Sequence, residues 1–306
     1  MTKKASVLGD INIDIITPPF KLPEDESSCV LDEFTLSLGG NAINVAATLA
    51  SLGADHEFFG AMGDDAISQW IISKCKTLNI NTNLRILEGH SAGITFAMTY
   101  FEGRRQFVAT LGTNQLLKLD HINTETLLKS DHLHRSGFWY TPQLKGEPTI
   151  SLMKRMISNG KQTSLDVGWD PAGFNDQNRE LLYNTLEYCE YFFANEKELK
   201  AITKKTDLNE AVQILLNISK IIDDPKIIIH QGKGGSTIVT KKDKIKIPTK
   251  DIPQNNPTGT GDVYNAGFIY GLLKNWNLEK CGIYADLVAC VHLADKSKIY
   301  PKQNDL

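Results

Sequence analysis

The sequence lacks long hydrophobic runs, a clear excess of one charge, and clustered cysteines. No stretch approaches the roughly 18 apolar residues that a membrane-spanning helix needs. The 306 residues include 33 basic and 36 acidic side chains, so the formal net charge is only −3, and no basic field suggests a nucleic-acid partner. The five cysteines are scattered without Cys-x-x-Cys spacing, which disfavours zinc sites and disulfides. We therefore expect a soluble, cytoplasmic protein that binds neither nucleic acid nor membrane.

Short apolar segments alternate with helical patterns from about residue 121 onward. The predicted strands are 132–136, 162–166, 191–194 and 226–230, and the predicted helices are 149–158, 178–187 and 208–221. Buried strands that alternate with helices indicate a mainly parallel sheet covered on both faces, and therefore a three-layer α/β/α fold. Ligands in such folds bind beyond the carboxyl ends of the strands.

The first third of the chain has a different pattern. The alternation predicts strands at 5–16, 29–38 and 56–59, helices at 41–52 and from about 66 to 77, and two β-rich runs, 94–101 and 106–109, on either side of a turn at 102–104. Asn12 and Asp14 alternate with isoleucines, so they share one face of their strand. Either that face of the strand is simply exposed to solvent, or the two polar side chains bind a ligand.

A glycine-rich loop precedes a predicted helix at 263–274. Its sequence is Pro257-Thr258-Gly259-Thr260-Gly261-Asp262. The first N–H groups of a helix lack intrahelical partners and lie at the positive end of the dipole, so the loop is a candidate anion site. Asp262 stands at the start of the helix. It is either an N-cap or a carboxylate beside the bound anion.

The loop and a second segment together resemble a known family. Residues 257–262, with Gly267 five positions on, resemble the C-terminal signature of the ribokinase-like (pfkB) carbohydrate kinases, and residues 39–53 resemble their N-terminal signature. The resemblance implies one ribokinase-like chain over residues 1–306. Strands from about 12–38 and 91–109 would form a small β-sheet lid, and the remainder would form the large α/β domain. A homodimer joined through the lid is one assembly that the sequence allows.

The resemblance also implies roles for residues at both signatures. Asp262 matches the catalytic base, and Gly259, Thr260 and Gly261 match the loop that binds the transferring phosphate. The residues that match contacts to substrate are Asn12, Asp14, Gly39, Gly40 and Asn44. From the residues alone, Asn44 could instead be an amide in the core.

Two further motifs match the family's nucleotide and metal contacts, so ATP and Mg²⁺ are the implied cofactors. Asn195 and Glu198 match an Asn-x-x-Glu motif that holds magnesium largely through water, although acidic residues also favour first turns of helices. Gly232 and Gly235 match a Gly-x-x-Gly loop that packs against the nucleotide, although alone they are an ordinary turn. His230 stands where many relatives carry threonine.

Some positions depart from the ribokinase pattern. Asn256 replaces an aspartate that helps bind a monovalent cation, and residues 294–297 replace another conserved stretch of the family, which argues against potassium activation. The segment 137–142 lacks the glutamate that ribokinases use on ribose. Trp139 and Tyr140 in it either stack on a ring of the substrate or lie in the core.

Three functions therefore stay open. The first is an ATP-dependent phosphotransferase that moves the γ-phosphate of Mg-ATP to a hydroxyl of a small sugar or sugar acid. The second is a nucleoside kinase on the same fold. The third is a non-catalytic sugar- or nucleotide-binding protein, which would not need Asp262. His132 and His134 share a strand face, and we expect them to be a hydrogen-bonded structural pair, since no third metal ligand is suitably spaced.

Overall fold

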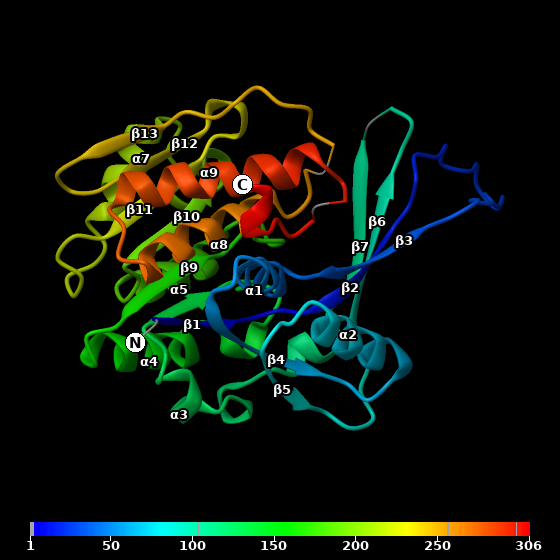
Figure 1. Cartoon of the computed structure of the whole chain (residues 1–306), viewed down its shortest axis with the longest axis horizontal. Coiled ribbons are helices and arrows are strands. Elements are labelled where there is room, and N and C mark those ends of the chain that lie inside the picture. Colours follow the sequence, from blue (N-terminus) through cyan, green and yellow to red (C-terminus); the bar gives the residue numbers. More distant parts are fainter. Residues whose placement is uncertain (1–2, 103, 256, 298) are drawn as a thin grey trace.

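The fold is a three-layer α/β/α sandwich with a second, smaller sheet at one end (Figure 1). The computed structural model describes residues 3–102, 104–255, 257–297 and 299–306. Two residues discussed above lie outside the described residues. They are Gly103, which belongs to the predicted turn, and Asn256, which replaces the aspartate that helps ribokinases bind a monovalent cation. Within the described residues, no helix is long and apolar enough to cross a membrane.

The large sheet runs in the order β13-β12-β11-β10-β9-β8-β1-β4-β5. Its strands are β1 (Lys4–Leu8), β4 (Asp55–Met62), β5 (Thr82–Ile86), β8 (His132–Arg135), β9 (Gln162–Asp166), β10 (Tyr191–Asn195), β11 (Lys226–His230), β12 (Ser236–Val239) and β13 (Lys244–Ile247). The seven strands β11, β10, β9, β8, β1, β4 and β5 run parallel to one another. Strands β12 and β13 join the β11 edge in antiparallel orientation. This confirms the predicted mainly parallel sheet.

Helices cover both faces of the large sheet because each carries an apolar side. One face is covered by α3 (Thr124–Leu127), α4 (Glu147–Ser158), α5 (Asp176–Leu186), α6 (Glu196–Thr203) and α7 (Leu208–Leu216). The other face is covered by α1 (Asn41–Ser51), α2 (Ala66–Thr77), α8 (Thr260–Leu273) and α9 (Leu278–Ala294). The side chain of Asp65 caps α2 by accepting from the Ser68 N–H.

The small sheet has the order β3-β2-β6-β7, and we call it the lid. Its strands are β2 (Asn12–Ile16), β3 (Thr35–Gly39), β6 (Gly93–Thr99) and β7 (Arg105–Thr110). The register places Asp14 between Ser37 and Thr95 on one face, and Ile15 between Leu36 and Phe96 on the other. One face of the lid is therefore polar and the other apolar.

Several predicted elements need correction. The segment 5–16 is two strands in different sheets, because the chain leaves the large sheet at Gly9 and enters the lid at Asn12. The strand predicted at 29–38 begins only at Thr35, and residues 29–34 are irregular and mostly exposed. The helix predicted to reach residue 221 ends at Leu216. The sequence reading missed β5 and α9.

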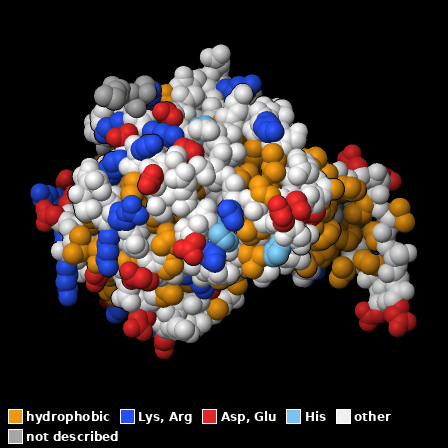
Figure 2. Space-filling view, turned by 90° about the horizontal axis from the view of Figure 1, so that it is seen from below, with side chains coloured by type: hydrophobic (Ala, Val, Ile, Leu, Met, Phe, Trp, Pro, Cys, Tyr) orange, Lys and Arg blue, Asp and Glu red, His pale blue; other side chains and the backbone are white. Residues whose placement is uncertain are grey.

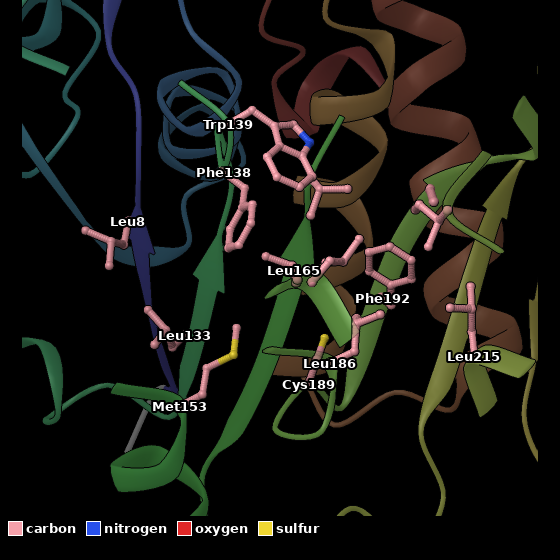
Figure 3. Packing of buried hydrophobic residues seen from close by; sticks show 14 of the residues in the cluster. Leu8, Leu133, Phe138, Trp139, Met153, Leu165, Leu186, Cys189, Phe192 and Leu215 are labelled. Atoms are coloured by element: carbon pink, nitrogen blue, oxygen red, sulfur yellow. The ribbon is translucent and has the colours of Figure 1, made fainter. Parts of the chain in front are cut away.

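The core lies on both sides of the large sheet. Figure 3 shows Phe138 and Trp139 among the residues from β9, β10 and α4 that fill one side. Trp139 is only 6% exposed and meets Phe138 and Phe174 edge to face at centroid distances of 4.9 and 5.9 Å. Of the two predictions for Trp139, the core role is therefore the one observed.

Candidate active site

Two cavities lie on either side of the loop that begins α8. The lid cavity, of about 300 Å³, lies between the polar face of the lid and the start of α8, and its lining includes Asp14, Gly259 and Asp262. The β11 cavity opens at the carboxyl end of β11, and its lining includes Thr260 and Gly261. Consecutive residues of one loop thus border both spaces.

Helix α8 begins at this loop without a side-chain cap. Gly259 is the N-cap residue and has a left-handed backbone (φ 77°), which glycine adopts without strain. No side chain caps the helix, and the first turn of any helix leaves N–H groups without intrahelical partners. The N-cap alternative for Asp262 is therefore wrong, because Asp262 is the third residue of the helix and its carboxylate points elsewhere.

The Asp262 carboxylate is buried at the edge of the lid cavity. The amide nitrogen of Asn44 donates to Asp262 Oδ2 (3.0 Å), and the Tyr300 hydroxyl donates to Asn44 Oδ1 (3.0 Å). Burial raises the pKa of Asp262 well above its ordinary value, and the negative charge of Asp166 adds to this effect. The contact of Asn44 with Asp262 and its place in the cavity lining argue against a purely structural amide.

Asp14 lines the same lid cavity as Asp262. Asn12 Nδ2 donates to Asp14 Oδ1 (2.7 Å) and to Thr95 Oγ1 (2.9 Å). Burial raises the pKa of Asp14 to about 6. The adjacent Gly39 makes room for this carboxylate, because a Cβ at Gly39 would lie 2.0 Å from Asp14 Oδ1. Asn12 and Asp14 do share one face, and that face lines the cavity.

Asp10 is a buried carboxylate that the sequence reading did not select. Its oxygens accept from the N–H groups of Asn41 (3.2 Å) and Ala42 (3.0 Å), so it holds the start of α1 at the lid cavity. Gly40, which precedes this helix, also lines the cavity. A single aspartate after a strand gives no signal of such a role in the sequence.

A further acidic residue, Glu198, lies in the first turn of α6. Asn195 and Glu198 form a capping box, in which Asn195 Oδ1 accepts from the Glu198 N–H (3.0 Å) and Glu198 Oε2 accepts from the Asn195 N–H (2.9 Å). The capping role weighed in the sequence reading is thus real. Burial and the charge of nearby Asp166 nevertheless raise the pKa of Glu198 above its ordinary value.

Asp166, at the end of β9, is a second residue that the sequence reading missed. Its carboxylate accepts from Asn265 Nδ2 (2.5 Å) and from the Gly168 N–H (2.9 Å). Burial also raises its pKa. Across the described part of the chain, neither Asp166 nor Glu198 forms an ion pair with lysine or arginine, so two buried carboxylates lie near each other without a counter-charge.

The remaining predicted residues fall into two groups. Asn195, Gly232 and Gly235 line the β11 cavity together with His230. Tyr140 lines the lid cavity, unlike its buried neighbour Trp139. His132 Nε2 and His134 Nδ1 each lie 2.7 Å from Ser164 Oγ, which confirms the hydrogen-bonded structural pair. No metal-binding group of three or more acidic, histidine or cysteine side chains occurs among the residues described.

Known proteins match the chain over nearly its whole length. Residues 2–305 match the model of the pfkB family carbohydrate kinases. The chain is 24% identical to an ATP-dependent ribose-1-phosphate kinase of Halopiger xanaduensis, with 91% of this chain and 88% of the relative covered. It is 27% identical to a nucleoside kinase of Methanocaldococcus jannaschii, with 92% and 87% covered.

The fold is also that of solved kinases. The ribokinase of Thermotoga maritima superposes with a TM-score of 0.83 at 23% identity, and the match covers 99% of this chain and 97% of that one. Residues of both signature segments line these cavities: Gly40, Asn41 and Asn44 of the first, and Thr258 to Asp262 of the second. The chain therefore belongs to the pfkB family of carbohydrate kinases.

Proposed function

We propose that this kinase transfers the γ-phosphate of Mg-ATP to a hydroxyl group of a small sugar or sugar acid. The observation that carries the proposal is the loop from Thr258 to Asp262, which borders the lid cavity on one side and the β11 cavity on the other. The acceptor would occupy the lid cavity and the nucleotide the β11 cavity. The phosphoryl group would then pass between them at the start of α8.

The lid cavity suits an acceptor with several hydroxyl groups. Carboxylate and amide oxygens of Asp14, Asn12 and Asn44 line it and can accept hydrogen bonds from hydroxyls. Its volume of about 300 Å³ is at the small end for ligand sites, which fits a monosaccharide.

Asp262 would act as the base. The acceptor oxygen forms a bond to the γ-phosphorus, the bond from that phosphorus to the bridging oxygen breaks and releases ADP, and the hydroxyl proton passes to the Asp262 carboxylate. The raised pKa of Asp262 makes it a better proton acceptor near neutral pH. Backbone N–H groups at Gly259, Thr260 and Gly261 would stabilise the transferring phosphoryl group, each by roughly 3 kcal/mol.

Asp166 and Glu198 would hold the magnesium ion. Two buried carboxylates without a basic partner among the described residues fit a cation, and magnesium prefers oxygen ligands and retains water. The capping box fixes the orientation of Glu198. A bound magnesium ion would supply charge neutralisation for the phosphates. Gly232 and Gly235 would border the nucleotide in the β11 cavity.

A nucleoside acceptor is the second candidate. Phe107 and Tyr140 both line the lid cavity, and aromatic rings can stack on a base. One relative is named a nucleoside kinase.

We also propose a homodimer in which the apolar face of one lid packs on the lid of a second copy. Leu36, Phe96 and Val108 are 39%, 44% and 57% exposed and lie in one cross-strand row with Ile15. In the space-filling view, hydrophobic side chains gather over the lid (Figure 2). Exposed apolar patches of this kind mark interaction surfaces.

The test is ADP release from Mg-ATP with a panel of acceptors: ribose, fructose, ribose 1-phosphate, 2-keto-3-deoxygluconate, 5-dehydro-2-deoxygluconate, adenosine, cytidine and inosine. We expect turnover with a sugar or sugar acid. Turnover with nucleosides alone would reject the sugar assignment in favour of the second candidate.

The Asp262→Asn variant tests the base. We expect kcat to fall at least about a hundredfold, the usual worth of general-base catalysis, while ATP affinity changes only a few-fold. Asp55→Asn, an exposed carboxylate away from both cavities, is the matched control. Near-normal turnover of Asp262→Asn would refute the assignment.

A further inference from the structure

Tyr300 reaches the proposed active site from a segment that neither signature contains. Its hydroxyl donates to Asn44 Oδ1 (3.0 Å), and Asn44 Nδ2 donates in turn to Asp262 Oδ2 (3.0 Å). The three side chains therefore form a chain of two hydrogen bonds that ends on the proposed base. Tyr300 is not among the described residues that line the lid cavity, and it has no role in the mechanism proposed above.

The segment around Tyr300 is bonded to two helices. Ser51 Oγ, at the end of α1, donates to the Tyr300 carbonyl (2.8 Å). Gln303 Nε2 donates to the hydroxyl of Tyr270, which belongs to α8. Helix α1 also contains Asn44, and α8 contains the proposed base, so the helices that hold this segment hold its partners as well. The tyrosine is therefore fixed relative to the groups that its hydroxyl serves.

The Tyr300 hydroxyl is a hydrogen-bond donor near neutral pH. Burial raises the pKa of Tyr300, and the charges of Asp14 and Asp262 add to this effect, so the hydroxyl keeps its proton. The side-chain amide of Asn44 has a donor end and an acceptor end. Because the tyrosine donates to the acceptor end, the donor end is directed at the Asp262 carboxylate.

The orientation of Asn44 affects the ionisation of Asp262. Burial raises the pKa of Asp262, and the charge of Asp166 adds to this effect. The charges of Asp10 and Asp14 act in the same direction, whereas the hydrogen bond from Asn44 opposes them. A reversed amide would direct its oxygen at the carboxylate and lose this bond. Hydrogen bonds in a chain also strengthen one another, so the tyrosine makes the amide a better donor.

We propose that Tyr300 is a positioning residue for the proposed base, because its hydroxyl holds Asn44 with the amide N–H toward Asp262. This inference rests on the proposed function, since the bond serves the reaction only where Asp262 accepts the proton. It makes the ionised form of the base depend on a residue outside both signatures. A tyrosine that only filled space would act through its ring, and loss of its hydroxyl would leave the ionisation of Asp262 unchanged.

Tyr300→Phe removes the hydroxyl and keeps both the ring and the carbonyl that accepts from Ser51. We expect kcat to fall by about two- to tenfold, the usual worth of one hydrogen bond, with the KM for ATP nearly unchanged. The acidic limb of the kcat profile should move to higher pH by up to about one unit, because protonation of Asp262 is opposed less strongly. Tyr284→Phe removes a hydroxyl from another half-buried tyrosine, which is absent from the described linings of both cavities, and should behave like the wild type.

A double-mutant cycle with Asp262→Asn separates action through the base from a general weakening of the site. If Tyr300 acts through Asp262, then Tyr300→Phe should change the residual turnover of Asp262→Asn by less than about twofold. Equal fold losses in the two backgrounds would overturn the inference, and so would an unchanged acidic limb in Tyr300→Phe.

The pKa of the Asp262 carboxyl can also be measured without turnover, by carbon-13 NMR of protein labelled at the aspartate carboxyl carbons. Asp262→Asn assigns the signal. We expect a higher pKa in Tyr300→Phe than in the wild type, and no change in Tyr284→Phe. If the wild type turns over none of the acceptors, the proposed function is rejected. If it turns over a sugar and the carboxyl has equal pKa values in wild type and Tyr300→Phe, the inference alone is rejected.

Discussion

Asp14, which is partly buried, and Asp262, which is buried, are two carboxylates that line one cavity, and both have raised pKa values. Burial disfavours their charged forms, and each also lies in the field of the other acidic groups at the site. The proposed acceptor, with its hydroxyl groups, would compensate for this burial by donating hydrogen bonds to the carboxylates. We therefore expect acceptor binding to depend on ionised Asp14.

This role of Asp14 predicts a pH dependence. Acceptor affinity should fall as the pH drops through about 6, because protonation of Asp14 removes a charged hydrogen-bond acceptor. The measurement is the acceptor Kd between pH 5 and pH 8. Asp14→Asn should bind about tenfold or more weakly at high pH, as loss of a charged hydrogen bond does, and should lack this inflection. An unchanged inflection in the variant would assign it to another group.

A rise in pH through the titration of Asp14 affects folding stability and acceptor binding in opposite directions. The pKa of Asp14 in the folded protein is raised above its ordinary value of 3.8. The folded state therefore holds a proton that the unfolded state has released between these two pH values. The contribution of Asp14 to folding is present below pH 3.8 and is lost as the pH rises through about 6, whereas binding needs the higher pH.

Single residues of the site were predictable only where a motif surrounds them. Asp262 and Asn44 stand in recognisable signatures, and both reach the same cavity. Asp166 and Tyr300 could not be found in this way, because each acts through partners that are distant in sequence. Trp139 and Tyr140 are adjacent and aromatic, and only their packing shows that one is in the core.

At the level of elements, α8 depends on close packing against α9. A Cβ at Gly267 would lie 2.9 Å from the Ala285 Cα and 3.3 Å from Val288 Cγ2. Glycine at this position therefore lets the two helices approach closely. Since Gly259 to Asp262 lie at the start of the same helix, a shift of α8 would also move the proposed phosphate loop.

Gly267→Ala should therefore destabilise the protein by about 1–3 kcal/mol, the usual cost of overpacking. The helix propensity of alanine acts in the other direction, because it favours alanine over glycine by about 1 kcal/mol in an open helix. Urea unfolding measures the difference. A more stable variant would mean that propensity outweighs the clash and that α8 and α9 can separate at little cost.

Strands and helices whose apolar residues repeat at a regular spacing could be predicted from the sequence. The sheet to which each strand belongs could not. The alternation of 5–16 is real, yet residues 4–8 and 12–16 belong to different sheets. Asp10 lies between them, and its carboxylate accepts from the start of α1. Exposed residues 29–34 have β-like composition and no partner strand among the described residues, so composition alone overestimated β3.

At the scale of the molecule, the lid connects the proposed acceptor site to the proposed subunit contact. Its polar face lines the cavity, and Arg105 Nη1 of β7 donates to Thr258 Oγ1 of the proposed phosphate loop (3.0 Å). Its opposite face carries the apolar row of Ile15, Leu36, Phe96 and Val108. Pairing of two lids would remove that row from water.

The proposed dimer predicts the effect of a charge in the apolar row. We expect the wild type to have the mass of a dimer by light scattering after gel filtration. Phe96→Glu should shift it to a monomer, because a carboxylate would be buried without a partner. Ile221→Glu places the same charge on another exposed apolar residue, 52% exposed, and should leave the dimer intact. A monomeric wild type would contradict the proposal.

The alternation along the lid strands has an evolutionary consequence. Thr95, Phe107 and Ala109 reach the cavity from the lid but belong to none of the three buried clusters that stabilise the large domain. Mutations at these positions can thus accumulate without a large thermodynamic penalty, while Asp262 and its loop remain anchored in α8. Descendants of one ancestor can in this way acquire new acceptors and inherit the same chemical step.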